Sequence, residues 1–114
     1  MGTYVVTGAA SGIGAAIKQQ LEEDGHNVLS VDIQAADIVA NLATAEGRAE
    51  AVAAVREATR DGISGLVACA GGGSHVPDRA LITAVNYYVA VELVEGLRGQ
   101  LAEHRASVLF ISSN

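Results

Sequence analysis

The residues best suited to chemistry lie near the start of the chain, in the segment Thr7-Gly8-Ala9-Ala10-Ser11-Gly12-Ile13-Gly14. This segment separates a short apolar run from a helical one. Gly8 allows a sharp turn after a strand, Gly12 allows the backbone to approach a phosphate, and Gly14 allows a helix to pack closely. The free N–H groups at the start of that helix, together with its dipole, attract negative charge. The segment therefore predicts a turn that binds the pyrophosphate of a dinucleotide; the alternative is a tight strand-to-helix turn without a ligand.

An acidic side chain, Asp32, ends the next strand-like run. A carboxylate at this position accepts hydrogen bonds from the adenosine ribose and repels the 2′-phosphate of NADP. No Lys or Arg lies between Asp24 and Arg48 to neutralise such a phosphate. We therefore expect NAD as the cofactor, against the alternative of a solvated loop aspartate. Asp37 is a weaker candidate for the ribose contact because we expect it to open the following strand.

The elements that must position these residues alternate between strand-like and helical runs, which is typical of βαβ units. We expect strands at Tyr4–Thr7, Asn27–Asp32, Asp37–Ala40, Leu66–Ala70 and Ser107–Ile111. The predicted fold class is α/β: a Rossmann-type, doubly wound parallel sheet with strand order 3-2-1-4-5, truncated after the fifth strand. Residues 1–114 are expected to form a single NAD-binding domain.

Three helices are expected between these strands. The first carries Ile13, Ile17 and Leu21 on one face and ends at Gly25. The second spans Thr44 to Thr59, with Thr44 as its cap and Val52 and Val55 directed inward. The third covers roughly Ala80 to Glu103 and has two apolar strips: Val85, Val89, Leu93, Leu97 and Leu101 in one, and Tyr87, Val91 and Val94 in the other. A helix with two apolar strips packs on the sheet and also on a partner, so we expect this helix to contact a second protein surface.

Composition excludes several other functions. The chain has 13 acidic and 7 basic side chains, a balance that argues against nucleic acid or an anionic membrane as a partner. No apolar run approaches the ~20 residues of a membrane span, and no signal peptide is apparent. Cys69 is the only cysteine, which fits a reducing cytoplasm. The histidines His26, His75 and His104 lie in different predicted elements without metal-ligand spacing, so no metal site is expected.

The chain resembles the short-chain dehydrogenase/reductase family. The spacing Gly8-x3-Gly12-x-Gly14 after Thr7 is the turn of that family. The segment Ala68-Cys69-Ala70-Gly71 stands where the family usually has Asn-Asn-Ala-Gly. Val85-Asn86 matches its Val-Asn segment, and Phe110-Ile111-Ser112-Ser113 matches the strand end that carries its active-site serine.

The resemblance implies hydride transfer between NAD(H) and a small-molecule alcohol or carbonyl compound. It assigns Ser113 to the substrate oxygen and Asn86 to a water-linked proton relay. The family's Tyr-x3-Lys pair is not found in these 114 residues and would follow Ser113 by a dozen or more positions. Neither Tyr87 nor Tyr88 has a Lys four positions on, so neither replaces that pair. The resemblance also implies a homodimer or homotetramer that buries the second apolar strip of the third helix. Two hypotheses follow: an NAD-dependent oxidoreductase, or a module that binds NAD or another nucleotide without catalysis. A third is a flavodoxin-like or other nucleotide-binding α/β domain, over which the Thr7–Gly14 turn favours a dinucleotide.

Within the family, the chain is similar to bacterial 3α-hydroxysteroid dehydrogenase/carbonyl reductases, through Val31-Asp32-Ile33, the run from Asn41 to Arg48, and Cys69-Ala70-Gly71. This similarity implies a 3α-hydroxysteroid or another ketone as substrate. It also places further residues along the cofactor: Ile33, Asn41, Leu42, Cys69, Ala70 and Gly71. Asn41 replaces an Asp that often contacts adenine in the family, and an Asn can still offer its amide oxygen to the adenine amino group.

Overall fold

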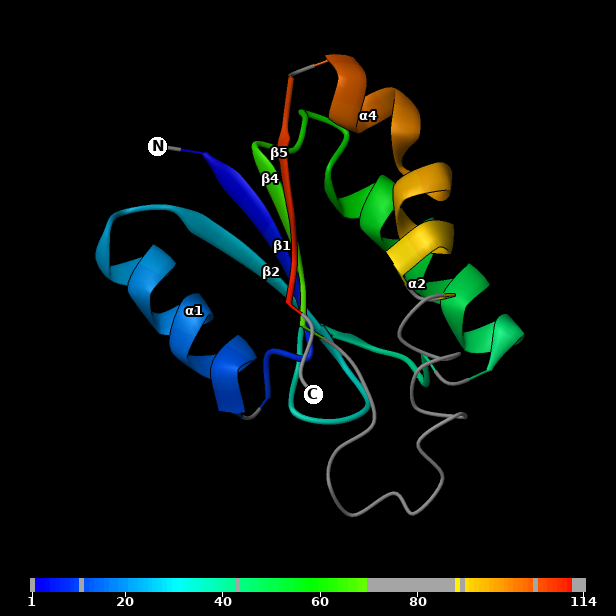
Figure 1. The fold of residues 1–114 in the computed structure, drawn as a ribbon, viewed down its shortest axis with the longest axis horizontal. Helices are drawn as coiled ribbons and strands as arrows, with labels where there is room; N and C mark the ends of the chain where they lie inside the picture. The colour runs from blue at the N-terminus through cyan, green and yellow to red at the C-terminus, as the bar shows by residue number, and fades with distance from the viewer. Residues whose placement is uncertain are drawn as a thin grey trace.

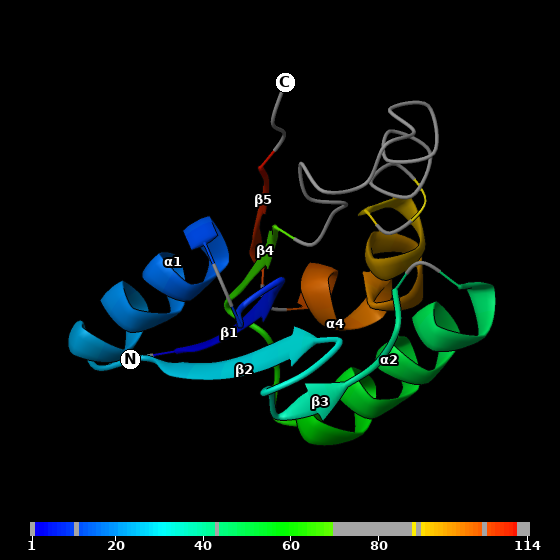
Figure 2. The same cartoon turned by 90° about the horizontal axis from the view of Figure 1, so that it is seen from below.

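A computed structural model describes residues 2–10, 12–42, 44–69, 88, 90–103 and 105–111 of the chain. These residues form one parallel sheet, drawn in Figure 1 and with all five strands labelled in Figure 2. Its order is β3-β2-β1-β4-β5, which confirms the predicted fold class and strand order. Three strands are shorter than expected, since β3 spans only Ile38–Val39, β4 ends at Ala68 and β5 ends at Phe110. The strands are β1 (Thr3–Thr7), β2 (Asn27–Asp32), β3 (Ile38–Val39), β4 (Gly65–Ala68) and β5 (Ser107–Phe110).

Helices cover both faces of the sheet (Figure 2). Helix α1 (Gly12–Glu23) lies on one face, and α2 (Ala45–Ala58), the helical residues 90–96 and α4 (Arg98–Glu103) lie on the other. Successive side chains of a strand point to opposite faces, so each strand contributes to two cores. On β1, Val5 joins the core beneath α2 and Val6 the core beneath α1. Both faces are therefore buried, as expected for a parallel sheet.

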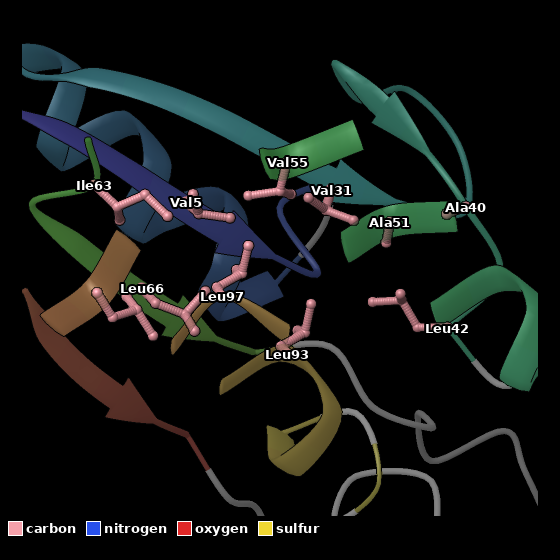
Figure 3. Packing of buried hydrophobic residues seen from close by; sticks show 11 residues of the cluster. Val5, Val31, Ala40, Leu42, Ala51, Val55, Ile63, Leu66, Leu93 and Leu97 are labelled. Atoms are coloured by element: carbon pink, nitrogen blue, oxygen red, sulfur yellow. The ribbon is translucent and has the colours of Figure 1, made fainter. Parts of the chain in front are cut away.

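The larger core lies between the sheet and three helical segments (Figure 3). Val5, Val31 and Leu66 come from the strands and are fully buried. They pack against α2 and against the leucines predicted for one strip of the third helix. The core comprises Val5, Val31, Ala40, Leu42, Ala51, Val55, Ile63, Leu66, Leu93, Leu97 and Leu101.

Helix α1 packs through Ile17 and Leu21, which contact Val6, Ala9 and Val67. The expectation that Ile13 shares this buried face is wrong, because its side chain is 57% exposed. The first turn of α1 lies near the carboxyl ends of the strands, where no strand remains beneath it. Gly25 ends the helix as predicted, with φ +89° and hydrogen bonds from Gly25 and His26 back to Glu22 and Leu21.

The other two predicted helices agree only in part with the structure. Thr44 caps α2 by accepting a hydrogen bond from the Gly47 N–H at 2.9 Å. The predicted continuous helix to Glu103 is interrupted by a turn at Leu97, although the Leu97 N–H still donates to the Leu93 carbonyl at 3.0 Å. The second apolar strip is divided: Val94 packs on the core, whereas Val91 is exposed. Residues 80–87 and 89 lie outside the described part of the chain.

Gly96 lies where the helical residues 90–96, which we continue to call the third helix, approach α2. A methyl group on Gly96 would lie 2.6 Å from a Val52 methyl, closer than atoms can pack, whereas a methyl group on Gly99 would meet nothing within 4 Å. We expect Gly96→Ala to lower the free energy of unfolding by about 1–3 kcal/mol through overpacking. Gly99→Ala should raise it by about 0.5–1 kcal/mol, because alanine is the better helix former.

Urea unfolding followed by circular dichroism measures both effects. The double variant Gly96→Ala/Val52→Ala should recover part of the loss, since the two sites share one contact. Equal stability of Gly96→Ala and Gly99→Ala would show that the helices do not depend on this close approach.

Strand β5 forms one edge of the sheet and is exposed along its whole length. Val108 pairs in register with Leu66, and Leu109 with Val67, so the two residues point to opposite faces. Leu109 and Phe110 are each 51% exposed. Among the described residues, this apolar edge of the sheet is thus accessible on both faces. In that part of the chain, no helix is long and apolar enough to cross a membrane.

Candidate cofactor site

The glycine-rich turn joins β1 to α1 at the carboxyl edge of the sheet. The Gly8 N–H donates to the Val31 carbonyl at 2.8 Å, and Gly8 adopts φ +70°, so the chain turns as soon as β1 ends. A side chain on Gly14 would collide with the Gly8 carbonyl oxygen. The close approach predicted for Gly14 is therefore present, but Gly14 approaches the backbone of the turn rather than the sheet.

Gly12 faces open space at the start of α1. Its φ is +59°, and a methyl group placed on it would meet no atom within 4 Å. The backbone at this point is accessible to a ligand, and it begins a helix whose first N–H groups have no intrahelical acceptor. Ile13 follows it with an exposed side chain. Ser11, also predicted to contact the cofactor, lies outside the described residues.

The Asp32 carboxylate connects the end of β2 to this turn. One oxygen, Oδ2, accepts a hydrogen bond from the Ala10 N–H at 2.9 Å, and Oδ1 accepts one from the Ile33 N–H at 2.6 Å. A carboxylate has about four acceptor positions, so two backbone donors leave capacity for two hydroxyl groups. The structure thus brings the predicted ribose acceptor against the predicted phosphate turn.

Asp37 has a different role. Its Oδ2 accepts hydrogen bonds from the Ser30 N–H at 3.0 Å and from the Ser30 hydroxyl at 3.1 Å. The Asp37 N–H donates in turn to the Ser30 hydroxyl at 2.8 Å. These bonds close the loop between β2 and β3. Strand β3 begins at Ile38, one residue after Asp37. The carboxylate therefore serves the local structure, consistent with its lower rank as a ribose acceptor.

The remaining predicted residues differ in their access to a ligand. The Ile33 side chain is 60% exposed beside Asp32, and Asn41 is exposed after β3. Leu42 has its side chain in the larger core, so any contact with a cofactor would involve its backbone. The Ala40 N–H donates to the Asp32 carbonyl at 2.9 Å, which places Asn41 at the same edge as Asp32.

Cys69 follows β4 at this edge. Its N–H donates to both the carbonyl and the hydroxyl oxygen of Thr7, at 3.2 and 3.1 Å, which ties the end of β4 to the start of the turn. The thiol is half-buried against Val6 and Val67. This burial raises the pKa of the Cys69 thiol and keeps it protonated at neutral pH. Cys69 thus behaves as a small, partly buried apolar residue at the end of β4.

Arg48 is a residue that sequence reasoning missed. It is buried, and its Nε donates to Glu92 Oε2 at 2.7 Å, while Nη1 donates to the Leu42 carbonyl at 3.1 Å. Its guanidinium carbon lies 5.8 Å from the centre of the Tyr88 ring. The only available signal was an arginine just inside an amphipathic helix, since Glu92 is far away in the sequence.

The predicted catalytic residues Asn86 and Ser113 lie outside the described residues, as do Ala70 and Gly71. No group of three or more His, Cys, Asp or Glu side chains is arranged to hold a metal ion within the parts of the chain that the structure describes.

A parallel sheet in the order 3-2-1-4-5, with a glycine-rich turn after β1 and an acidic residue at the end of β2, defines the Rossmann-type class of α/β proteins. Within that class the family can be stated. The chain belongs to the short chain dehydrogenase family, whose model matches residues 3–114. The resemblance seen in the sequence is thereby confirmed.

Two relatives agree with the similarity to bacterial 3α-hydroxysteroid dehydrogenase/carbonyl reductases seen in the sequence. The 3-alpha-hydroxysteroid dehydrogenase/carbonyl reductase of Comamonas testosteroni is 40% identical over 114 residues, which are 99% of this chain and 44% of that protein. The crystal structure of the 3-alpha-hydroxysteroid dehydrogenase from Pseudomonas sp. B-0831, complexed with NADH, superposes with a TM-score of 0.90 and 40% identity over 97% of this chain and 44% of that one.

A more distant oxidoreductase of the family, from Brucella ovis, is 26% identical with a TM-score of 0.79, over 95% of this chain and 59% of that one. The chain thus spans less than half the length of the Comamonas and Pseudomonas relatives.

Proposed function

We propose that the chain forms the NAD-binding part of an oxidoreductase that transfers hydride between nicotinamide and an alcohol or carbonyl compound, with a 3α-hydroxysteroid or a similar ketone as substrate. The observation that carries the proposal is the contact between the Asp32 carboxylate and the Ala10 N–H. It places an acceptor for the ribose hydroxyls beside a turn with accessible backbone at Gly12. The names of the Comamonas and Pseudomonas relatives support the substrate class.

Charge at the site supports NAD over NADP. The 2′-phosphate of NADP would meet the Asp32 carboxylate, and a nearby cation would be needed to offset the repulsion. Arg48 is the first basic residue after Lys18 in the sequence. Its guanidinium is engaged with Glu92 and the Leu42 carbonyl, so it is not available for a phosphate.

The other roles in this proposal follow from the family resemblance. Gly8, Gly12 and Gly14 shape the pyrophosphate turn, with Ser11 and Ile13 beside it. Asn41 and Leu42 border the adenine, and Ala70 and Gly71 lie along the cofactor after Cys69. Bound NAD would supply the hydride acceptor. Ser113 would hold the substrate oxygen and Asn86 a water molecule.

A fluorescence titration with NADH and NADPH tests the proposal. We expect NADH to bind at least about tenfold more tightly than NADPH, a difference of about 1.4 kcal/mol. Absence of NADH binding would overturn the proposal. Because residues 1–114 contain no Tyr-x3-Lys pair, we expect no reduction of NAD by a 3α-hydroxysteroid with this segment alone. Steady-state turnover by the segment would contradict that expectation.

Alkylation of Cys69 gives an independent measure of cofactor binding. Because burial raises the thiol pKa, the thiolate fraction at pH 8 is lower in the folded chain than in the unfolded one. We expect iodoacetamide to react at least about threefold more slowly with the folded chain, and the rate to keep rising as pH rises through the elevated pKa. NAD should slow the reaction further, and NADP at the same concentration should not. Equal protection by both nucleotides would speak against the assigned site.

The proposal also includes the oligomeric state of the protein and its location in the cell. Tyr88 and Val91 are exposed on the third helix, and this apolar surface supports a homodimer or homotetramer formed through that helix. The acidic composition and the single cysteine support a cytoplasmic location.

A further inference from the structure

Arg48 is the one buried basic residue in the described part of the chain, with 8% of its surface exposed. Burying a guanidinium is costly unless its N–H groups are paired with good geometry. Arg48 meets this requirement with partners from two other segments: the Glu92 carboxylate on the third helix and the Leu42 carbonyl before α2. The planar guanidinium can hold both partners in a fixed relation, which a lysine ammonium cannot do as well.

The Leu42 carbonyl belongs to a short connection that is fixed at several points. The Asn41 carbonyl accepts hydrogen bonds from the Thr44 N–H at 3.2 Å and from the Thr44 hydroxyl at 3.1 Å. A side chain on Gly47 would collide with that same Asn41 carbonyl, so α2 begins in direct contact with the connection. The backbone on both sides of the Asn41 side chain is thereby held in place.

These bonds continue to the ribose acceptor. The Ala40 N–H donates to the Asp32 carbonyl at 2.9 Å, one residue before Asn41. A chain of short contacts therefore leads from Asp32, through residues 40–42, to Arg48 and Glu92. The exposed ion pair of Arg60 with Glu57, by contrast, joins two residues three positions apart at the end of α2.

We infer that Arg48 is a positioning residue for adenine recognition: anchored by Glu92, it holds the Leu42 carbonyl and so fixes Asn41 where its amide oxygen accepts from the adenine amino group. This inference rests on the proposed NAD site. It makes purine selectivity depend on a contact between α2 and the third helix. A residue with only a structural role would affect the stability of the protein without changing which purine the folded protein prefers.

The test compares NAD with its hypoxanthine analogue, in which a carbonyl oxygen replaces the adenine amino group. Dissociation constants are measured at low temperature, where circular dichroism shows each variant to be folded. We expect the wild type to prefer NAD by about tenfold, the value of one well-placed hydrogen bond. Asn41→Ala and Arg48→Met should each reduce that preference to about twofold or less. In the double variant the preference for NAD should fall no further, because both substitutions remove the same hydrogen bond to the adenine amino group.

Two further variants separate positioning from folding. Arg60→Met removes an exposed arginine of equal charge and should leave the tenfold preference unchanged. Glu92→Gln keeps an oxygen acceptor for Arg48 and should reduce the preference by about two- to threefold, even if Arg48→Met does not fold. An unchanged preference in both Arg48→Met and Glu92→Gln would overturn the inference, as would a wild type that does not distinguish the two dinucleotides. Failure of the wild type to bind NAD at all would instead refute the proposed function.

Discussion

Gly12→Ala is expected to weaken NAD binding by about 100-fold, equivalent to about 2.7 kcal/mol, while lowering the free energy of unfolding by only about 1 kcal/mol. The methyl group would enter the open space at the start of α1, which is the space assigned to the pyrophosphate. The φ of +59° adds backbone strain of about 1 kcal/mol for a residue with a side chain. NADH titration and thermal unfolding together measure the two effects.

Gly25→Ala is the matched control for this prediction. Gly25 also has a positive φ, +89°, and a methyl group there would also meet nothing within 4 Å. Gly25 lies at the opposite end of α1. Gly25→Ala therefore also introduces backbone strain, but far from the proposed phosphate site. Both variants should lose about 4–8 °C in Tm, the shift expected for 1 kcal/mol in a domain of this size. Equal NADH affinity of the two variants would show that the space beside Gly12 holds no phosphate.

Asp32→Ala is expected to reduce NAD affinity by about 30- to 100-fold and to narrow the difference between NAD and NADP to about twofold. Hydrogen bonds to a charged acceptor contribute about 1.5–3 kcal/mol, and the substitution would remove those to the ribose. It would also remove the repulsion of the 2′-phosphate, so NADP should lose less affinity than NAD. Titration of each variant with both nucleotides at two salt concentrations separates the charge effect, which salt screens.

Asp37→Ala provides the comparison for Asp32→Ala. Asp37 belongs to the same loop region and its carboxylate accepts two hydrogen bonds from Ser30, so its loss should destabilise the connection between β2 and β3. It should leave the ratio of NAD to NADP affinity unchanged. If Asp32→Ala also left that ratio unchanged, the ribose role of Asp32 would be refuted and the carboxylate would serve only to bind the Ala10 N–H.

The glycine-rich turn and the ends of α1 and α2 were predictable because each depends on a local pattern. The order of the strands was predictable because right-handed crossovers leave few arrangements of a parallel sheet. Apolar runs separated by helical periods require a parallel sheet, and Gly14, Gly25 and Thr44 act within a few residues of themselves. The acceptor Asp32 was predictable for a similar reason: the end of β2 must meet the carboxyl edge where the turn after β1 lies.

Other features depend on what lies across the fold. Periodicity placed Ile13 with Ile17, but the sheet ends beneath the first turn of α1 and leaves Ile13 exposed. The interruption at Leu97 lies beside Gly96, where two helices approach closely. The pairing of Arg48 with Glu92 joins residues far apart in the sequence, and a charge pattern does not indicate which acid an arginine will meet.

The sequence by itself therefore determined the type of fold and the turn and acid of the proposed site, because local backbone geometry and side-chain periodicity specify them. Only the tertiary structure decided that Leu42 is in the core and that Arg48 joins its carbonyl to the third helix. Burial and pairing at long range depend on which surfaces pack together, and that is settled only when the elements meet.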